Sequence, residues 1–201
     1  MPKKKPSTFE ALLGPMLLSK IGEYIETPNF RNFKNSFFHH GPSVQTDEAL
    51  KGKDFIVLYF SGAWCPSCQR FTPLLKDFYA ICKDKANQEK LKKVDIEIVY
   101  ISSDRDLVEF QKTYRDMPWL ALESQKHKTS VSKKCHIANI PSLVVLDRKG
   151  RFITDTATDN VVAAGGFVEK VVEVIELWRS QKGVPLDEAT FTNSGSNCII
   201  S

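Results

Sequence analysis

Two cysteines three residues apart, Cys65 and Cys68, are the residues of this sequence best suited to chemistry. A thiol attacks a disulfide as its thiolate, and a nearby second thiol can resolve the mixed disulfide that forms. The spacing places the two side chains one turn apart on a helix. At the start of a helix, the unpaired N–H groups and the dipole favour the thiolate of Cys65. The pair can therefore exchange disulfides, with Cys65 as the nucleophile and Cys68 as the resolving thiol.

The residues around the pair support this chemistry. Trp64 comes directly before the first cysteine and offers a flat apolar contact to a partner. Pro66 lies between the cysteines, where its fixed φ suits the first helical turn and stiffens the small ring. The run 55–60 is apolar, β-branched and aromatic, which predicts a central strand covered on both faces. The pair is therefore expected where a buried strand gives way to a helix.

The other expected elements follow from hydrophobic periodicity and turn residues. They are a helical turn at 47–50, a buried strand at 96–101, a helix that starts at Asp104, an extended segment at 117–122, a short helix or loop at 126–136, a hairpin of strands at 143–146 and 151–154, and a last helix at 167–178. This order predicts an α/β fold, in which helices flank a central, largely parallel sheet with an antiparallel edge hairpin.

The bulk composition is that of an ordinary globular protein. The 201 residues carry a formal net charge of +4, which is too mild to suggest nucleic-acid binding. No apolar run reaches the roughly 18 residues of a membrane-spanning helix, and no secretory signal follows the basic N-terminus. Five cysteines, an odd number, do not match a secreted disulfide framework. We therefore expect a reducing, cytoplasmic setting. A monomer is also expected.

Other interpretations of the cysteines remain open at this point. A Cys-x-x-Cys pair is also half of a zinc site, which Cys135 and His136 could complete. The pair could also consist of two ordinary core cysteines, which the strand before it and the helix after it disfavour. Cys82 lies on the apolar face of the predicted helix and is interpreted as a small buried hydrophobe. Cys135 is either structural or a regulatory thiol.

The sequence around these residues resembles the tryparedoxin and nucleoredoxin branch of the thioredoxin superfamily. The matching segments are Tyr59 to Cys68, Phe71-Thr72-Pro73, Val99 to Asp104, Met117 to Ala121 and Ile140 to Asp147. The resemblance implies a thioredoxin fold, with a cis Pro141 that faces the thiols and exposes backbone groups to an extended peptide. It implies the following substrate contacts: Trp64, Pro66, Trp119, Ile140 and Pro141. Thioredoxin carries a buried aspartate where this chain has Tyr59, so the proton acceptor for Cys68 is not identified.

The resemblance also implies partners and a function. The protein would reduce protein disulfides, typically those of a peroxiredoxin, and would take electrons from glutathione, trypanothione or a reductase. Its only redox group would be the Cys65–Cys68 disulfide, with no metal or other cofactor. The alternative is a redox-sensing binding module of nucleoredoxin type, in which Trp64, Trp119 and Pro141 hold a partner. Replacing Cys68 with serine distinguishes the reductase from the binding module, since an enzyme would lose turnover and a binding module would keep its partner.

The two ends of the chain are expected to lie outside the main domain. We expect an N-terminal extension at 1–27, a thioredoxin-like domain at 28–182 and a flexible tail at 183–201. The last four residues, Cys198 to Ser201, fit a prenylation pattern in which a final serine favours farnesyl. A single lipid gives reversible membrane attachment. The sequence therefore predicts partial membrane association through Cys198.

Overall fold

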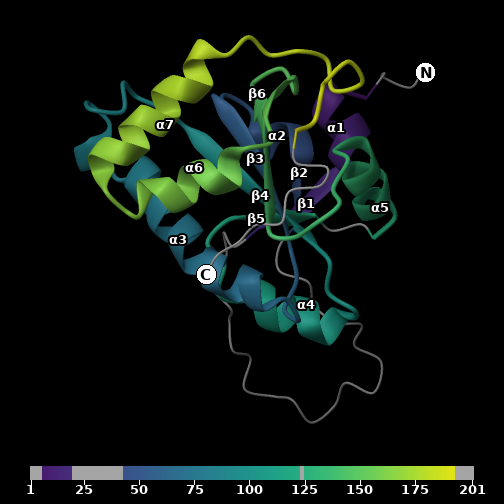
Figure 1. The fold of residues 1–201 in the computed structure, drawn as a ribbon. Helices are drawn as coiled ribbons and strands as arrows, with labels where there is room; N and C mark the ends of the chain where they lie inside the picture. The colour runs from purple at the N-terminus through teal and green to yellow at the C-terminus, as the bar shows by residue number, and fades with distance from the viewer. Residues whose placement is uncertain (1–5, 20–42, 123–124, 193–201) are drawn as a thin grey trace.

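The computed structural model describes residues 6–19, 43–122 and 125–192, in which strands and helices alternate from α2 to β6 (Figure 1). The strands are β1 (Met16–Leu18), β2 (Ser43–Gln45), β3 (Phe55–Ser61), β4 (Ile96–Ser102), β5 (Leu120–Leu122), β6 (Ser142–Asp147) and β7 (Phe152–Thr154). The helices are α1 (Thr8–Leu13), α2 (Thr46–Leu50), α3 (Pro66–Lys83), α4 (Leu107–Tyr114), α5 (Gln125–Lys134), α6 (Ala157–Ala164) and α7 (Val168–Ser180), with a 3-10 turn at Lys85–Asn87. None of these helices is both long and apolar enough to cross a membrane.

The described strands form one mixed sheet in the order β2-β1-β5-β4-β3-β6-β7. The central strand β3 runs parallel to β4 and antiparallel to β6. β4 and β5 are also parallel, and β6 and β7 form the antiparallel edge hairpin that the sequence predicts. The predicted mixed sheet is therefore confirmed. Antiparallel pairing extends further than predicted, because β1 and β2 add a second antiparallel edge.

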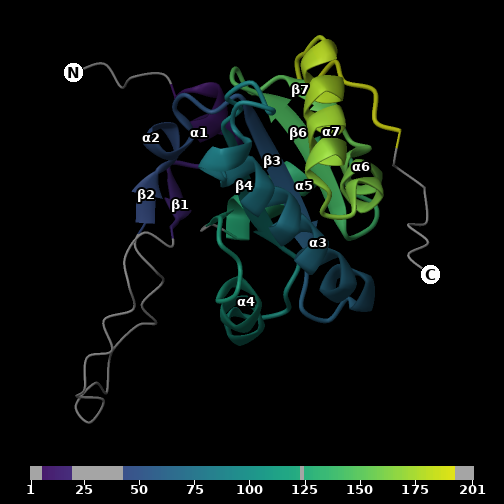
Figure 2. The same ribbon diagram turned by 90° about the vertical axis from the view of Figure 1, so that its left-hand side faces the viewer.

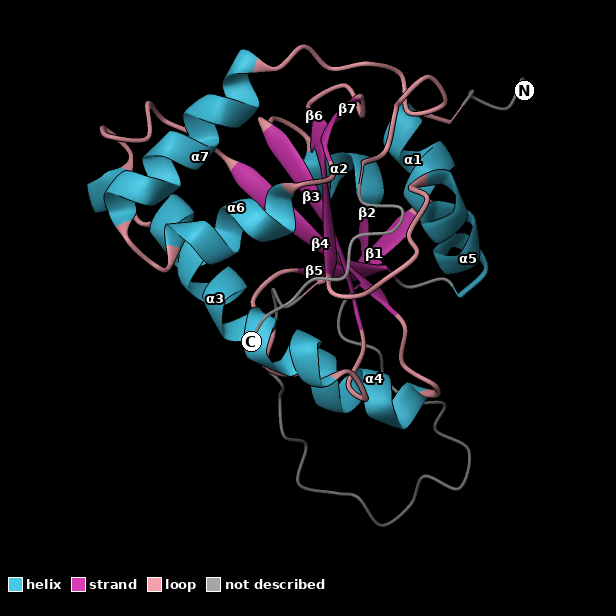
Figure 3. Ribbon diagram, viewed as in Figure 1, coloured by secondary structure: helices cyan, strands magenta, loops and turns pink. Residues whose placement is uncertain are grey.

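Helices cover both faces of this sheet (Figure 2; Figure 3). Alternate side chains of β3, beginning at Phe55, pack with α3, α6 and α7 on one face. The side chains between them, beginning at Ile56, pack with α1, α2 and α5 on the other. Burying a large apolar side chain stabilises a fold by about 1.5–3 kcal/mol, so a strand with two covered faces carries a continuous apolar run.

The N-terminal residues 8–18 belong to the domain itself, which corrects the predicted extension at 1–27. β1 pairs antiparallel with β2 on one side and with β5 on the other. Leu13 of α1 and Leu17 of β1 are completely buried. Gly14 adopts a φ of +84°, which lets the chain turn directly from the helix into the strand. A three-residue strand paired with distant residues leaves too short a pattern to be read from the sequence.

The chain after α7 folds back onto the sheet, which corrects the flexible tail predicted at 183–201. In the described part of that range, which we call the C-terminal segment (residues 183–192), Val184 exchanges two backbone hydrogen bonds with Phe152 of β7. The Phe191 ring lies 4.8 Å from the Phe152 ring, centroid to centroid. This segment therefore covers the edge of the hairpin.

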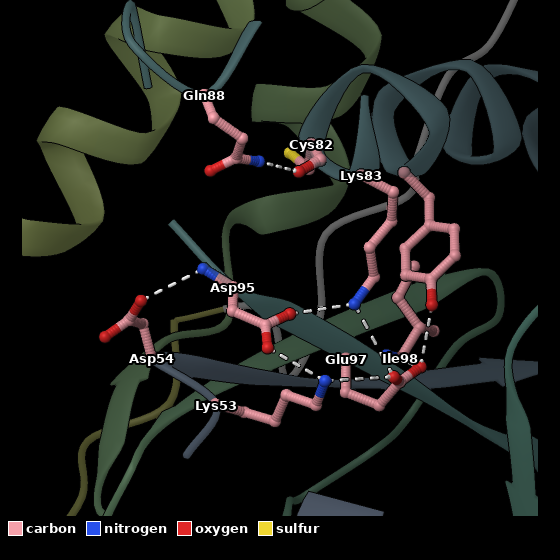
Figure 4. Close-up of polar contacts among 9 residues, drawn as sticks. Lys53, Asp54, Cys82, Lys83, Gln88, Asp95, Glu97 and Ile98 are labelled. Atoms are coloured by element: carbon pink, nitrogen blue, oxygen red, sulfur yellow. Dashed lines mark hydrogen bonds and ion pairs between the residues drawn. The ribbon is translucent and has the colours of Figure 1, made fainter. Parts of the chain in front are cut away.

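A cluster of charged side chains fixes the C-terminal end of α3 to the start of β4 (Figure 4). The Nζ atoms of Lys53 and Lys83 each lie 2.9 Å from a carboxylate oxygen of Asp95. The hydroxyl of Tyr79 donates a hydrogen bond of 2.9 Å to Glu97, whose side chain is buried in β4. The end of α3 opposite the cysteines is thereby held in place.

Candidate active site

Cys65 and Cys68 lie where β3 gives way to α3. Cys65 is the N-cap residue of the helix, and its Sγ accepts a hydrogen bond of 3.2 Å from the N–H of Cys68. Pro66 occupies the first turn, where no N–H partner is needed. The two cysteines are paired as a disulfide with Cα atoms 5.2 Å apart. Cys65 is 6% exposed and Cys68 is 1% exposed, which is the order expected of a nucleophile and a resolving thiol.

Trp64 stands on the surface beside the pair. Its side chain is 47% exposed, and its indole N–H donates a hydrogen bond of 2.8 Å to the carbonyl oxygen of Ser103. Gly62 leaves room for the indole, because a Cβ at this position would lie 3.0 Å from the Trp64 Nε1. The ring is thus fixed in one orientation while its face stays open to a partner.

The carboxylate of Asp104 holds the loop that leads to the cysteines. It accepts a hydrogen bond of 2.5 Å from the N–H of Ala63, and bonds of 2.7 Å from the hydroxyls of Tyr100 and Ser102. The sequence predicted that Asp104 starts a helix, but the N-cap of α4 is Asp106. Asp104 is therefore a site residue that the sequence reasoning missed. The available signal was its place just after a strand parallel to β3, since such strand ends meet at one edge of the sheet.

The loop before β6 closes the site on the other side. The Ile140–Pro141 peptide bond is cis, as the sequence predicts, and Pro141 is buried. The carbonyl oxygen of Ile140 lies 3.6 Å from the Sγ of Cys65. Antiparallel pairing of β6 with β3 brings this loop to the thiols across 75 residues of sequence. An extended chain that approaches Cys65 therefore meets the backbone of Ile140.

A neutral tyrosine lies beneath the first turns of α3. The hydroxyl of Tyr59 lies 2.8 Å from the Oγ1 of Thr72, which in turn donates to the carbonyl oxygen of Cys68. Burial raises the pKa of Tyr59, although hydrogen bonds with Ser61 and Thr72 act in the opposite direction. The hydroxyl is therefore protonated at neutral pH, and it stabilises the helix rather than accepting a proton.

Trp119 is a core residue, which corrects the substrate contact that the sequence predicts for it. Its side chain is only 2% exposed. The ring meets those of Tyr59 and Tyr79 edge-on, at centroid distances of 6.0 and 5.7 Å. Because Trp119 directly precedes β5, the sheet carries its side chain into the core beneath α3. It supports Tyr59 from within and cannot contact a docked protein.

A groove of about 510 Å³ extends from Cys68 between α3 and α4. Trp64 and Cys68 line one part of it, together with the loop that follows β3. Charged side chains from the two helices and from the turn after α4 line the rest: Lys76, Glu109, Lys112, Arg115 and Asp116. The groove therefore carries charged groups of both signs and reaches the redox pair at Cys68.

The remaining thiols are placed differently. Cys82 and Cys135 are each 1% exposed, and burial raises the pKa of both to about 12. The predicted lipidation residue Cys198 lies outside the described residues. Across residues 6–19, 43–122 and 125–192, no three His, Cys, Asp or Glu side chains gather as metal ligands would. Within these ranges, Cys135 and His136 therefore do not join Cys65 and Cys68 in such a group.

Comparisons with known proteins converge on one group. A family model of thioredoxin-like proteins matches residues 52–152, a range that contains the cysteine pair, Asp104 and Pro141. Probable nucleoredoxin 1 of Arabidopsis thaliana is 39% identical over 132 residues, which are 63% of this chain and 22% of that protein. The chain thus matches about a fifth of that relative's length.

Solved structures give the same picture. The tryparedoxin from Trypanosoma brucei superposes with a TM-score of 0.60 and 28% identity, over 82% of this chain and 96% of that one. A tryparedoxin II in complex with glutathionylspermidine has a TM-score of 0.52 and 34% identity, over 67% of this chain and 93% of that one.

Proposed function

Because the chain belongs to the thioredoxin-like family and has the thioredoxin fold, we propose that it reduces disulfides in other proteins. The observation that carries this proposal is the setting of Cys65. Its sulfur caps the N-terminus of α3 and lies beside the carbonyl oxygen of Ile140. A thiolate at a helix N-terminus is stabilised by N–H groups and the helix dipole, and an extended peptide can pair with exposed backbone groups.

In the first step, the thiolate of Cys65 attacks one sulfur of the target disulfide. A new disulfide forms between Cys65 and the target, and the other target sulfur leaves as a thiolate that takes up a proton. The N–H of Cys68, which points at the Sγ of Cys65, holds the attacking thiolate in place. The open face of Trp64 gives the target an apolar surface next to the reacting sulfurs.

In the second step, the thiolate of Cys68 attacks the Sγ of Cys65. The Cys65–Cys68 disulfide forms, and the second target sulfur leaves as a thiolate, so the target gains two electrons and two protons. The helix holds the two cysteines one turn apart, which makes this attack intramolecular. Tyr59 and Thr72 hold the carbonyl end of Cys68 in position while its sulfur moves.

Two further thiols must then reduce the Cys65–Cys68 disulfide. A structural relative, tryparedoxin II, has been solved in complex with glutathionylspermidine. This supports a glutathione-type thiol as the electron donor, with glutathione and trypanothione as the candidates. A peroxiredoxin is the protein substrate that we expect, because it is the typical target of the tryparedoxin branch.

The Cys68→Ser variant tests the proposal against the alternative, a redox-sensing binding module. A reductase that lacks its resolving thiol should lose steady-state turnover and accumulate a Cys65–target mixed disulfide, which dithiothreitol releases. Mass spectrometry of the variant after incubation with an oxidised peroxiredoxin detects this adduct. Two results together would favour the binding module instead: the variant binds the peroxiredoxin without a covalent bond, and the wild-type protein shows no turnover.

A further inference from the structure

The groove between α3 and α4 carries positive charge that the fold does not use. Lys76 on α3 and Lys112 on α4 both line it. Neither ammonium group has a hydrogen bond or ion pair within the described part of the chain. The two lysines come from separate helices, so their convergence on one surface is a product of the fold rather than of a local charge run.

The acidic side chains of the same groove are already engaged. The carboxylate of Glu109 accepts a hydrogen bond of 3.0 Å from the N–H of Arg105, and it also lies 3.9 Å from the Arg105 guanidinium. Asp116 lies 3.5 Å from the guanidinium of Arg115. The groove therefore presents Lys76 and Lys112 as its unpaired charges, and an occupant that carries carboxylates would complement them.

The position of the groove indicates what would enter it. A target that presents a disulfide to Cys65 must cover Trp64, which also lines the groove. Lys76 lies eleven positions after Cys65, which corresponds to about 16 Å along the axis of α3. An extended chain spans that distance in about five residues. A peptide held at the thiols would thus bring residues about five positions away to the two lysines.

We propose that this groove binds an acidic segment of the protein substrate, about four to six residues from the disulfide that Cys65 attacks. The proposal rests on the proposed reductase function and adds a substrate class to it. Exposed ion pairs contribute modestly to affinity but steer the encounter, so the effect should fall on KM and vanish at high salt.

Three synthetic disulfide peptides with the same ring test the proposal. They carry Glu, Gln or Lys at positions four to six from the cysteine, on both sides of the ring, and dithiothreitol serves as the donor. For the wild-type protein at low salt, kcat/KM for the Glu peptide should exceed that for the Gln peptide about fivefold, as two exposed ion pairs would provide. In about 0.5 M NaCl the preference should disappear, because the charges are then screened.

Charge reversal provides the decisive variant. In Lys76→Glu/Lys112→Glu the order should invert, so that the Lys peptide becomes the preferred substrate. The neutral variant Lys76→Gln/Lys112→Gln should show no preference, which guards against a folding defect in the charged variant. The control Lys51→Glu reverses one lysine charge at the end of α2, outside the groove, and should keep the wild-type preference.

Equal kcat/KM for the three peptides, or an acidic preference that survives charge reversal, would overturn the groove proposal while leaving the reductase function intact. If the wild-type protein reduced none of the peptides faster than Cys65→Ser does, the reductase function would be rejected. The groove proposal would then be rejected with it.

Discussion

Two backbone groups contact the sulfur of the nucleophile. The Sγ of Cys65 accepts the N–H of Cys68, an interaction that favours the thiolate. The same sulfur lies 3.6 Å from the carbonyl oxygen of Ile140, which favours the protonated thiol. The first group belongs to the first turn of α3 and the second to the loop before β6, so the reactivity of Cys65 depends on residues that hold these two segments.

Asp104 is the most important of these residues on the α4 side. Asp104→Ala would leave the N–H of Ala63 and the hydroxyl of Ser102 without the carboxylate that accepts from them. A buried polar group without a hydrogen-bond partner destabilises the folded state by about 1–3 kcal/mol. We therefore expect the free energy of unfolding to fall by about 2 kcal/mol. Misplacement of the loop should lower kcat/KM for insulin reduction about tenfold. Urea unfolding and steady-state assays measure the two effects.

Asp104→Asn is the matched control, because its amide oxygen can still accept the bond from Ala63. It should retain more stability and more activity than Asp104→Ala. An alanine variant with wild-type activity would show that the carboxylate does not position the cysteine loop.

The buried thiols should be inert in the folded protein. Burial raises the pKa of Cys82 and Cys135 to about 12, so almost none of either thiol is ionised at neutral pH. In the reduced protein, iodoacetamide should therefore modify Cys65 well before either of them, and all of them should react once urea unfolds the chain. Peptide mapping by mass spectrometry shows the order in which the cysteines are modified. Labelling of Cys135 as fast as Cys65 would instead indicate a regulatory thiol.

Among the elements, α3 determines the geometry of the pair and is held at both ends. At its C-terminal end, burial alone would raise the pKa of Asp95, but hydrogen bonds and charge attraction from Lys83 and Lys53 outweigh it and the pKa is lowered. The unfolded chain therefore binds a proton at Asp95 at a higher pH than the folded protein does. The stabilisation is present above the unfolded pKa, near 3.8, and is lost as the pH falls through the lower folded value.

Asp95→Asn tests this account of the helix end. Since the carboxylate is half exposed, we expect it to contribute only about 0.5–1 kcal/mol to stability at pH 7. Urea unfolding from about pH 7 to about pH 2 should show that the difference between wild type and variant shrinks toward zero at the acid end. A difference that stays constant over that range would mean that the cluster does not act through charge.

The C-terminal segment acts on the opposite loop. Phe191 stacks on His136 at 4.9 Å, and the N–H and hydroxyl of Thr192 both donate to Asp155 at 2.7 Å. His136 lies in the loop that follows α5 and leads to the cis Pro141. The segment thus covers the chain that places the Ile140 carbonyl oxygen beside Cys65.

Phe191→Ala should loosen that loop. We expect a loss of about 1–2 kcal/mol in unfolding free energy, less than for a fully buried phenylalanine, and faster hydrogen exchange at residues 136–140. Thr190→Ala, at an exposed neighbouring position, serves as the control and should change neither quantity. Unchanged exchange in Phe191→Ala would show that the segment covers the loop without stabilising it.

At the scale of the whole molecule, the fold brings three distant segments to one edge of the sheet. The start of α3 after β3 carries the thiols, the residues after β4 include Asp104, and the loop before β6 includes Pro141. Parallel pairing of β3 with β4 and antiparallel pairing with β6 make this convergence a consequence of topology. The groove between α3 and α4 opens from the same edge.

Strong local patterns made much of this arrangement predictable. The apolar run at β3, the helical period of α3 and the turn between β6 and β7 each identify their element without reference to the rest of the chain. The cysteine spacing and the Ile140-Pro141 dipeptide identified both sides of the thiol site. What escaped prediction depends on pairing between distant residues: the edge strands β1 and β2, the C-terminal segment and the role of Asp104. The burial of Trp119 was missed because a motif does not show which face of the sheet a side chain occupies.

The reduction of a protein disulfide tests the central claim most directly. Wild-type protein and Cys65→Ser would be compared in steady-state reduction of insulin and of an oxidised peroxiredoxin, first with dithiothreitol and then with glutathione or trypanothione as the donor. The account predicts turnover by the wild-type protein, loss of turnover in Cys65→Ser, and a clear preference for one of the two biological thiols. Turnover that survives in Cys65→Ser, or a wild-type protein whose Cys65–Cys68 disulfide titrates but reduces neither substrate with any donor, would contradict it.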